Sequence, residues 1–275
     1  MLKPQQASYI ISTDLDGTLL DHFSYKWDAA KPSLDKLTTL AIPVIINTSK
    51  TFEEVLLLQE DMSIFQPFVV ENGSGAYFPK SQYPEQPPGS EARGDHWQIT
   101  LGCPRKEIVN FLQRLRKEKK WDFQGFSDMS LDDVISLTGL AAENAKLALL
   151  RSFSEPLIWH DSEENYQAFV KRVEEQNLRV IKGGRFIHIL GQTDKGKAII
   201  WCKNYLQTLS KQAASLIALG DSPNDIDMLN IADFPVLIKS PTHDYPEISS
   251  GSNIIKTKGF GPVGWHEAIE QLIFS

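Results

Sequence analysis

The sequence predicts an α/β protein with a parallel-sheet core and a second, α+β domain inserted into it. Strand and helix patterns alternate over residues 1–80, a block of different character follows, and the alternation returns after residue 190. Such alternation requires a parallel sheet with helices on its faces. We therefore expect a core built from 1–80 and 190–275, with the inserted domain at 81–189.

The first part of the core begins with an apolar run, Tyr9–Ser12, that ends in Asp and Gly residues. A short apolar run bounded by turn residues predicts a buried strand. Leucines at helical spacing predict the next helix, which tolerates Pro32 in its first turn. The elements expected in order are a helix at 31–40, a strand at 43–47, a helix at 51–61 and a strand at 68–71.

The middle of the chain has another composition. Residues 79–94 are rich in Pro, Gly and charge, which predicts a linker or long loop. Gly183 and Gly184, between two expected strands, are typical of a hairpin turn. The elements expected here are strands at 97–101, 122–126, 155–159, 178–182 and 186–190, and helices at 104–119, 131–138, 141–151 and 162–176. This mixture predicts an α+β domain with its own core.

The last third returns to the first pattern, with a helix at 195–209, strands at 216–219 and 235–238, and an amphipathic helix at 267–274. The 275 residues are 41% hydrophobic, enough for a substantial core, and carry a net charge of −7. That charge argues against a nucleic-acid binder. Cys103 and Cys202 lack a CxxC spacing and are expected to be reduced thiols. Without an apolar leader or membrane span, the protein is expected in the cytoplasm; its oligomeric state stays open.

Polar residues follow several of the expected core strands. They are Asp14 and Asp16, Thr48 and Ser49, Glu71 and Asn72, and Asp221 and Asp225. In an open parallel sheet, neighbouring strand ends meet at one crevice, where ligands bind. Asp14 and Asp16, followed by Gly17, also place carboxylate oxygens close together, as Mg²⁺ prefers. A solvated turn is the alternative explanation of this pair.

The motif Asp14-Leu15-Asp16-Gly17-Thr18 resembles the opening motif of the haloacid dehalogenase-like phosphatases. Thr48, Lys195 and the segment Gly220-Asp221-Ser222-Pro223-Asn224-Asp225 resemble the second, third and fourth motifs of that superfamily, in order. The resemblance implies a Rossmann-like parallel-sheet core with an inserted cap domain that determines substrate specificity.

The resemblance also implies roles for these residues. Asp14 would be the nucleophile, and Asp16 would be the acid and base. Lys195 and Thr48 would bind the phosphate, with Ser49 and Asn72 beside them. Mg²⁺ would be held by Asp14, the backbone carbonyl of Asp16, and Asp221. The residues expected to orient this metal shell are Ser222, Asn224 and Asp225.

A narrower resemblance is to mannosyl-3-phosphoglycerate phosphatases, which release mannosylglycerate. Besides the four motifs, the segments that match include Val70-Glu71-Asn72-Gly73, Leu137-Thr138-Gly139-Leu140, Gly183-Gly184-Arg185-Phe186-x-His188 and Asp194-Lys195-Gly196. Arg185 would bind the substrate from the cap, because a guanidinium matches a carboxylate or phosphate with two parallel bonds. Glucosyl-3-phosphoglycerate and other sugar phosphates are alternative substrates. The cap would open and close on hinges at 79–94 and 191–194.

Local structural roles compete with several of these assignments. Thr48 or Ser49 would also serve as the cap of the helix that begins near residue 51, and Asp225 as the cap of a helix at 226–230. Lys197 lies close to Lys195 and offers the same charge. Two further candidates are Lys50, near the phosphate or in solvent, and His188. In an unbroken strand, His188 and Arg185 point to opposite faces, because side chains alternate along a strand. A core role is therefore expected for His188.

Other classes of function remain open from the residues. A non-catalytic sugar-phosphate sensor would keep the binding groups, but it would not need both Asp14 and Asp16. A phosphomutase shares this carboxylate pair, whereas a dehalogenase does not need the second carboxylate. A receiver-type phosphoacceptor would be much shorter and would lack the insertion. The expected partner is a small phosphorylated sugar or glycerate.

Overall fold

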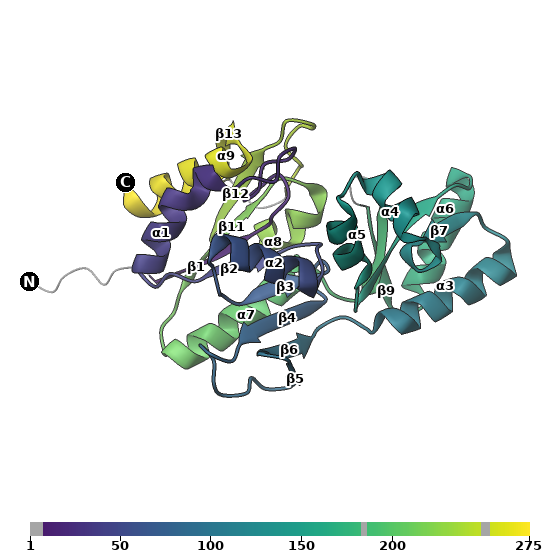
Figure 1. Cartoon of the computed structure of the whole chain (residues 1–275), viewed down its shortest axis with the longest axis horizontal. Helices are drawn as coiled ribbons and strands as arrows, with labels where there is room; N and C mark the ends of the chain where they lie inside the picture. The colour runs from purple at the N-terminus through teal and green to yellow at the C-terminus, as the bar shows by residue number, and fades with distance from the viewer. Residues whose placement is uncertain (1–7, 183–185, 249–253) are drawn as a thin grey trace, which may run out of the picture.

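The computed structural model describes residues 8–182, 186–248 and 254–275, which form two lobes (Figure 1). The larger lobe is built from both ends of the chain and contains a nine-stranded sheet in the order β13-β12-β11-β1-β2-β3-β4-β6-β5. The smaller lobe, drawn in teal, contains a four-stranded sheet in the order β7-β8-β10-β9. The predicted fold class, a parallel-sheet core with an α+β insertion, is confirmed.

The strands of the large sheet are β1 (Tyr9–Thr13), β2 (Val44–Asn47), β3 (Phe68–Val70), β4 (Gly75–Pro79), β5 (Glu91–Arg93), β6 (His96–Thr100), β11 (Ser215–Gly220), β12 (Phe234–Lys239) and β13 (Ile255–Phe260). The strands from β13 through β3 are parallel to their neighbours, whereas β4, β6 and β5 add an antiparallel edge. β1 lies between β2 and β11, at the centre of the parallel part.

Helices cover both faces of this sheet. Ile11 points to a core shared with α1 (Lys31–Thr39), α2 (Phe52–Met62) and α9 (Gly261–Ile269). Its neighbour Ile10 points to the opposite core, where α7 (Lys195–Ser210) packs. The short helix α8 (Ile226–Asn230) packs near β11 and β12. Burial on both faces explains why the central strands are continuous apolar runs.

The smaller lobe has its own core. Its helices are α3 (Arg105–Lys119), α4 (Leu131–Thr138), α5 (Ala142–Leu149) and α6 (Glu163–Glu174), and its strands are β7 (Phe123–Gly125), β8 (Ser154–Trp159), β9 (Leu178–Lys182) and β10 (Ile187–Gly191). α3 and α6 pack on the sheet around Phe169, and a second cluster joins α4 and α5 around Val134.

The antiparallel edge of the large sheet corrects two expectations. The strand expected at 97–101 belongs to this sheet rather than to the inserted domain, because β6 pairs with β4. The segment 79–94 is not a linker or hinge between lobes, because its end forms β5, which pairs with β6. The chain instead crosses to the smaller lobe at 101–104 and returns at 192–194.

The C-terminal part corrects a third expectation. β13 was not predicted, and the last helix begins at Gly261 rather than near residue 267. β13 is an edge strand with lysines on its exposed side, so it lacks the apolar run that identified the central strands. Pro262 in the first turn of α9 was the available signal for the earlier start. Among the described helices, none has the length and apolar character to cross a bilayer.

Candidate active site

The predicted polar clusters lie at the carboxyl ends of neighbouring strands. Asp14 follows β1, Thr48 follows β2, Asn72 lies just beyond β3, and Asp221 follows β11. These strands are adjacent in the order β11-β1-β2-β3 and run parallel. Parallel strands place their carboxyl ends at one edge of the sheet, so residues far apart in the chain meet there.

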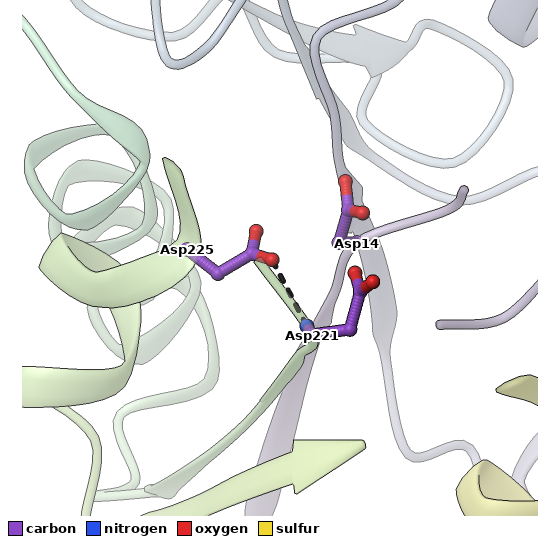
Figure 2. Close-up of side chains that lie close together, drawn as sticks. All are labelled: Asp14, Asp221 and Asp225. Carbon is purple, nitrogen blue, oxygen red and sulfur yellow. Dashed lines mark hydrogen bonds between the residues drawn. The ribbon is translucent and has the colours of Figure 1, made fainter. Parts of the chain in front are cut away.

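Three buried carboxylates converge at this edge: Asp14, Asp221 and Asp225 each offer an oxygen, and these oxygens lie within 4.8 Å of one another (Figure 2). Burial raises the pKa of Asp14 well above its usual value, against the opposing effect of Lys195. Burial, with the charge of Asp225, also raises the pKa of Asp221 to about 7. Such crowded carboxylates are stabilised by a proton or a cation, and their oxygens suit a hard divalent metal.

The loop after β1 approaches Asp221 closely. Gly17 has a φ of +79°, and a Cβ at this position would lie 2.6 Å from Oδ2 of Asp221. The hydroxyl of Thr18 donates to Oδ1 of Asp221 at 3.1 Å. Both residues therefore have a structural role in the motif. Gly17 leaves room for Asp221, and Thr18 fixes the orientation of its carboxylate.

Lys195 bridges two of the carboxylates. Its Nζ lies 2.6 Å from Oδ1 of Asp14 and 2.7 Å from Oδ1 of Asp225, and its side chain is fully buried. Burial alone would lower the pKa of this ammonium, but attraction to the two carboxylates raises it above the usual value. Asp194 caps α7 by accepting the N–H of Lys197 at 2.7 Å. Lys197 is exposed, so Lys195 is the lysine that reaches the site.

Asp225 organises the turn after β11. Its Oδ2 accepts the N–H groups of Asp221 and Ser222, each at 3.0 Å. Its side chain does not cap α8, contrary to the alternative considered from the sequence. Ser222 donates to Asn224 at 2.5 Å, and Asn224 donates to Oδ1 of Asn72 at 3.0 Å. A chain of polar contacts thus runs from the turn after β11 to the turn after β3.

Thr48 is buried, and its carbonyl accepts the N–H of Asn72 at 2.9 Å. Neither Thr48 nor Ser49 caps α2, because Thr51 does so in a capping box with Glu54. The structure therefore removes the helix-cap explanation for both residues and places them in the turn between β2 and α2.

Asp16 contacts Lys50, whose position, near the phosphate or in solvent, the sequence did not decide. Nζ of Lys50 lies 2.9 Å from Oδ2 of Asp16, and the Lys50 side chain is only 13% exposed. Oδ1 of Asp16 is buried without a hydrogen-bond partner in the described part of the chain. The carboxylate of Asp16 is not part of the three-carboxylate group.

Of the two site residues predicted in the smaller lobe, the structure describes His188. Arg185, with Gly183 and Gly184, lies outside the described residues. His188 is on β10, opposite Pro156 and Ile181. Burial, with a contribution from the charge of Arg151, lowers the pKa of His188 to about 3. His188 is half-buried, and its Nδ1 has no hydrogen-bond partner among the described residues, so the core role stays a prediction.

Sequence reasoning missed three contacts at the site. Arg151 of the smaller lobe donates to the carbonyl of Ser49 at 2.6 Å. Glu71, which had been noted without a role, accepts the N–H of Ser152 at 2.7 Å. Nε2 of His243 lies 3.5 Å from Oδ2 of Asp221. Arg151 and His243 belong to no motif, so no sequence signal identified them.

Comparison with known proteins shows the family to which the chain is similar. The model of the haloacid dehalogenase-like hydrolases matches residues 11–87 and 143–250. A glucosyl-3-phosphoglycerate/mannosyl-3-phosphoglycerate phosphatase of Persephonella marina is 36% identical over 269 residues, covering 96% of this chain and 97% of that protein. A phosphatase of the same name from Methanococcoides burtonii is 36% identical over 266 residues, with the same coverage of 96% and 97%.

The fold also resembles solved structures. The crystal structure of SMU.1108c from Streptococcus mutans aligns with a TM-score of 0.68 at 19% identity, covering 98% of this chain and 100% of that one. At this identity the likeness concerns the fold alone. It shows that both lobes are shared, because nearly the whole length of each chain aligns.

Proposed function

The chain belongs to the haloacid dehalogenase-like hydrolase family and is a phosphatase, and from this premise we propose that it hydrolyses mannosyl-3-phosphoglycerate to mannosylglycerate and phosphate. Glucosyl-3-phosphoglycerate is the second substrate that we propose. The named relatives support both sugars, since the match extends over both lobes. The observation on which the proposal rests is the meeting of Asp14, Asp221 and Lys195 at one edge of the sheet.

We propose Asp14 as the nucleophile. Its carboxylate forms a bond to phosphorus while the bond between phosphorus and the glycerate oxygen breaks, and Asp16 gives that leaving oxygen a proton. Water then attacks the phosphorus of the aspartyl phosphate, Asp16 takes up a proton, and Asp14 is regenerated with release of phosphate. Lys195, which contacts Asp14, places a fixed positive charge beside the transferred group, and Thr48 donates a hydrogen bond to it.

The buried carboxylates fit Mg²⁺, which we propose as the cofactor. Asp14, Asp221 and the backbone carbonyl of Asp16 would hold it, with Asp225, Ser222 and Asn224 fixing the turn that carries Asp221. When bound, the ion offsets the repulsion between an anionic nucleophile and an anionic phosphate. Ser49, Asn72 and Arg185 remain proposed substrate contacts. The inserted lobe is proposed as the specificity cap, and a cytoplasmic location stays a prediction.

The first test measures phosphate release from purified protein. With Mg²⁺, both glycosyl-3-phosphoglycerates should be hydrolysed with much higher kcat/KM than simple hexose phosphates, and a chelator should abolish the reaction. Asp14→Asn should lower kcat by roughly a thousandfold or more without unfolding the protein. Asp28→Asn changes an exposed aspartate outside the site and should leave kcat unchanged.

Two outcomes would contradict the proposal. Tight binding of these compounds without phosphate release would indicate a sensor. Preferential hydrolysis of simple hexose phosphates would keep the phosphatase but remove the named substrates. Circular dichroism and thermal melting of Asp14→Asn separate a lost nucleophile from a lost fold.

A further inference from the structure

A cleft of about 910 Å³ opens between the two lobes beside the site. The large lobe contributes the loop at 20–25 and α2, and the smaller lobe contributes residues 139–147. Its lining includes Tyr25, Lys50, Glu54, Leu57, Leu140 and Asn144. The proposed mechanism uses none of this space, although the substrate has a large part that is not phosphorylated.

Lys50 connects the cleft to the proposed reaction centre. Its Nζ lies 2.9 Å from Oδ2 of Asp16, the carboxylate that would protonate the leaving oxygen. A group attached close to that oxygen therefore comes within reach of the Lys50 ammonium. The ring of Tyr25 also lies near this ammonium, with its centroid 5.4 Å from Nζ.

The chemistry of the proposed substrate matches this arrangement. Glycerate has hydroxyl groups on carbons 2 and 3, so a 3-phosphate leaves carbon 2 for the sugar and carbon 1 for the carboxylate. The carboxylate and the sugar both branch from the carbon next to the phosphorylated one. A site for this molecule needs a cation near the leaving oxygen, to bind the carboxylate. It also needs an adjoining pocket large enough for an uncharged sugar.

We propose, on the basis of the proposed function, that the cleft receives the glycosyl-glycerate part of the substrate, with Lys50 binding the glycerate carboxylate and the sugar lying against α5 at Asn144. The ammonium and carboxylate form a charge-assisted hydrogen bond in a largely buried position. The exposed amide of Asn144 offers donors and an acceptor to sugar hydroxyls.

The remaining lining favours a neutral sugar. Leu57 and Leu140 offer apolar surface to the C–H groups of a sugar ring, and carboxylates accept hydrogen bonds from hydroxyls. Glu54, Glu60 and Asp61 also line the cleft and would repel a second phosphate. The cleft thus selects a neutral sugar linked to a carboxylate over a sugar bisphosphate.

The carboxylate is tested with two matched substrates, a glycosyl-3-phosphoglycerate and the analogue with a hydroxymethyl group in place of its carboxylate. The wild type should prefer the carboxylate by roughly tenfold or more in kcat/KM. Lys50→Met should bring this ratio close to one, while Lys26→Met, an exposed lysine outside the lining, should keep it. If Lys50 acted only through Asp16, both substrates would slow equally and the ratio would stay.

The sugar is tested by filling the cleft. Asn144→Trp should lower kcat/KM for glycosyl-3-phosphoglycerate by roughly tenfold and spare 3-phosphoglycerate, which has no sugar. Ala142→Trp places the same side chain at an exposed position of α5 outside the lining and should spare both substrates. Equal effects of the two tryptophans would overturn the assignment of the sugar. For a substrate that turns over too slowly, its inhibition constant against p-nitrophenyl phosphate measures binding, and the ratio of inhibition constants then replaces the ratio of kcat/KM.

The two proposals fail in different ways. If the wild type hydrolyses neither glycosyl-3-phosphoglycerate, the proposed function fails and this inference falls with it. If it hydrolyses them and neither ratio moves in the variants, the proposed function stands and the inference about the cleft alone is overturned.

Discussion

At the scale of single residues, Lys195 is the cation on which the buried carboxylates depend. It contacts Asp14 and Asp225 at 2.6 and 2.7 Å, and it has no exposed side-chain surface. Asp225 in turn accepts the N–H of Asp221. One ammonium therefore fixes the proposed nucleophile, Asp14, relative to the turn that bears a proposed metal ligand, Asp221. Removing one partner from such a buried set leaves uncompensated charge, which costs more than losing a surface ion pair.

Lys195→Met should lower the free energy of unfolding by about 3–5 kcal/mol, because Asp14 and Asp225 lose their buried partner. Urea denaturation in metal-free buffer measures this loss. Lys197→Met removes an exposed lysine two positions away and should change the stability by no more than about 0.5 kcal/mol. Similar losses in the two variants would show that Lys195 does not stabilise the site.

The aspartates of the site could be predicted because each follows a short apolar run, and strand ends of a parallel sheet meet. The contact of Lys50 with Asp16 could not, because the sequence allowed Lys50 to face solvent. The contacts of Arg151 with Ser49 and of His243 with Asp221 join a strand end to loops of no recognisable pattern. Such contacts depend on how the loops are packed, which periodicity does not encode.

At the scale of elements, the turn after β3 sets the position of α7. Gly73 has a φ of +92°, and a Cβ there would lie 2.1 Å from the carbonyl oxygen of Asp194. The hydroxyl of Thr193 also donates to the carbonyl of Gly73 at 2.8 Å. Asn72, which lies in the same turn as Gly73, donates its N–H to the carbonyl of Thr48 in the turn after β2. The spacing between Thr48 and Lys195 therefore depends on this close approach.

Gly73→Ala should therefore reduce both stability and kcat. Left-handed backbone strain costs about 1–2 kcal/mol, and the overlap with Asp194 adds displacement of α7. Gly89→Ala is the matched control, since Gly89 has a φ of +73° with nothing within 4 Å of its Cβ position. Thermal melting and measurement of kcat distinguish the two variants. Both quantities should fall in Gly73→Ala, whereas kcat should be unchanged in Gly89→Ala. Equal kcat values would mean that the turn does not position α7.

Central elements were predicted better than edge elements, for a physical reason. β1, β2 and β11 are buried on both faces and appear as apolar runs. β5 and β13 lie at the edges of the sheet, are largely exposed, and carry charged residues. The membership of β6 depends on its pairing with β4, which is a tertiary choice that local sequence does not specify.

At the scale of the whole molecule, the lobes are joined by more than two chain crossings. Residues 147–154 of the smaller lobe dock on the turns that follow β2 and β3: Thr51 donates to the carbonyl of Leu147 at 3.0 Å, and Glu71 accepts from Ser152 and Phe153 at 2.7 and 3.1 Å. Glu71 is buried. This contact fixes one side of the interface, so any opening of the cleft bends around it or breaks it.

Glu71→Gln should loosen this docking, because an amide carries no charge and only one acceptor oxygen for the Ser152, Phe153 and Ser154 donors. Hydrogen exchange of the amides of Ser152 and Phe153 should become about tenfold faster or more, whereas exchange within β1 should not change. Glu270→Gln, which alters a pair with Lys36 inside the large lobe, is the control. Unchanged exchange at both amides would show that Glu71 does not hold the lobes together.

The central place of β1 has a consequence for biosynthesis. β1 is made early, yet one of its two neighbours, β11, begins at Ser215 and leaves the ribosome only after the entire insertion. Until then one side of β1 presents unpaired backbone groups, a template for aggregation. We expect a chain stalled before Ser215 to leave Asp14 without Asp221, so that it lacks the group of carboxylates proposed as the active site until synthesis is nearly finished.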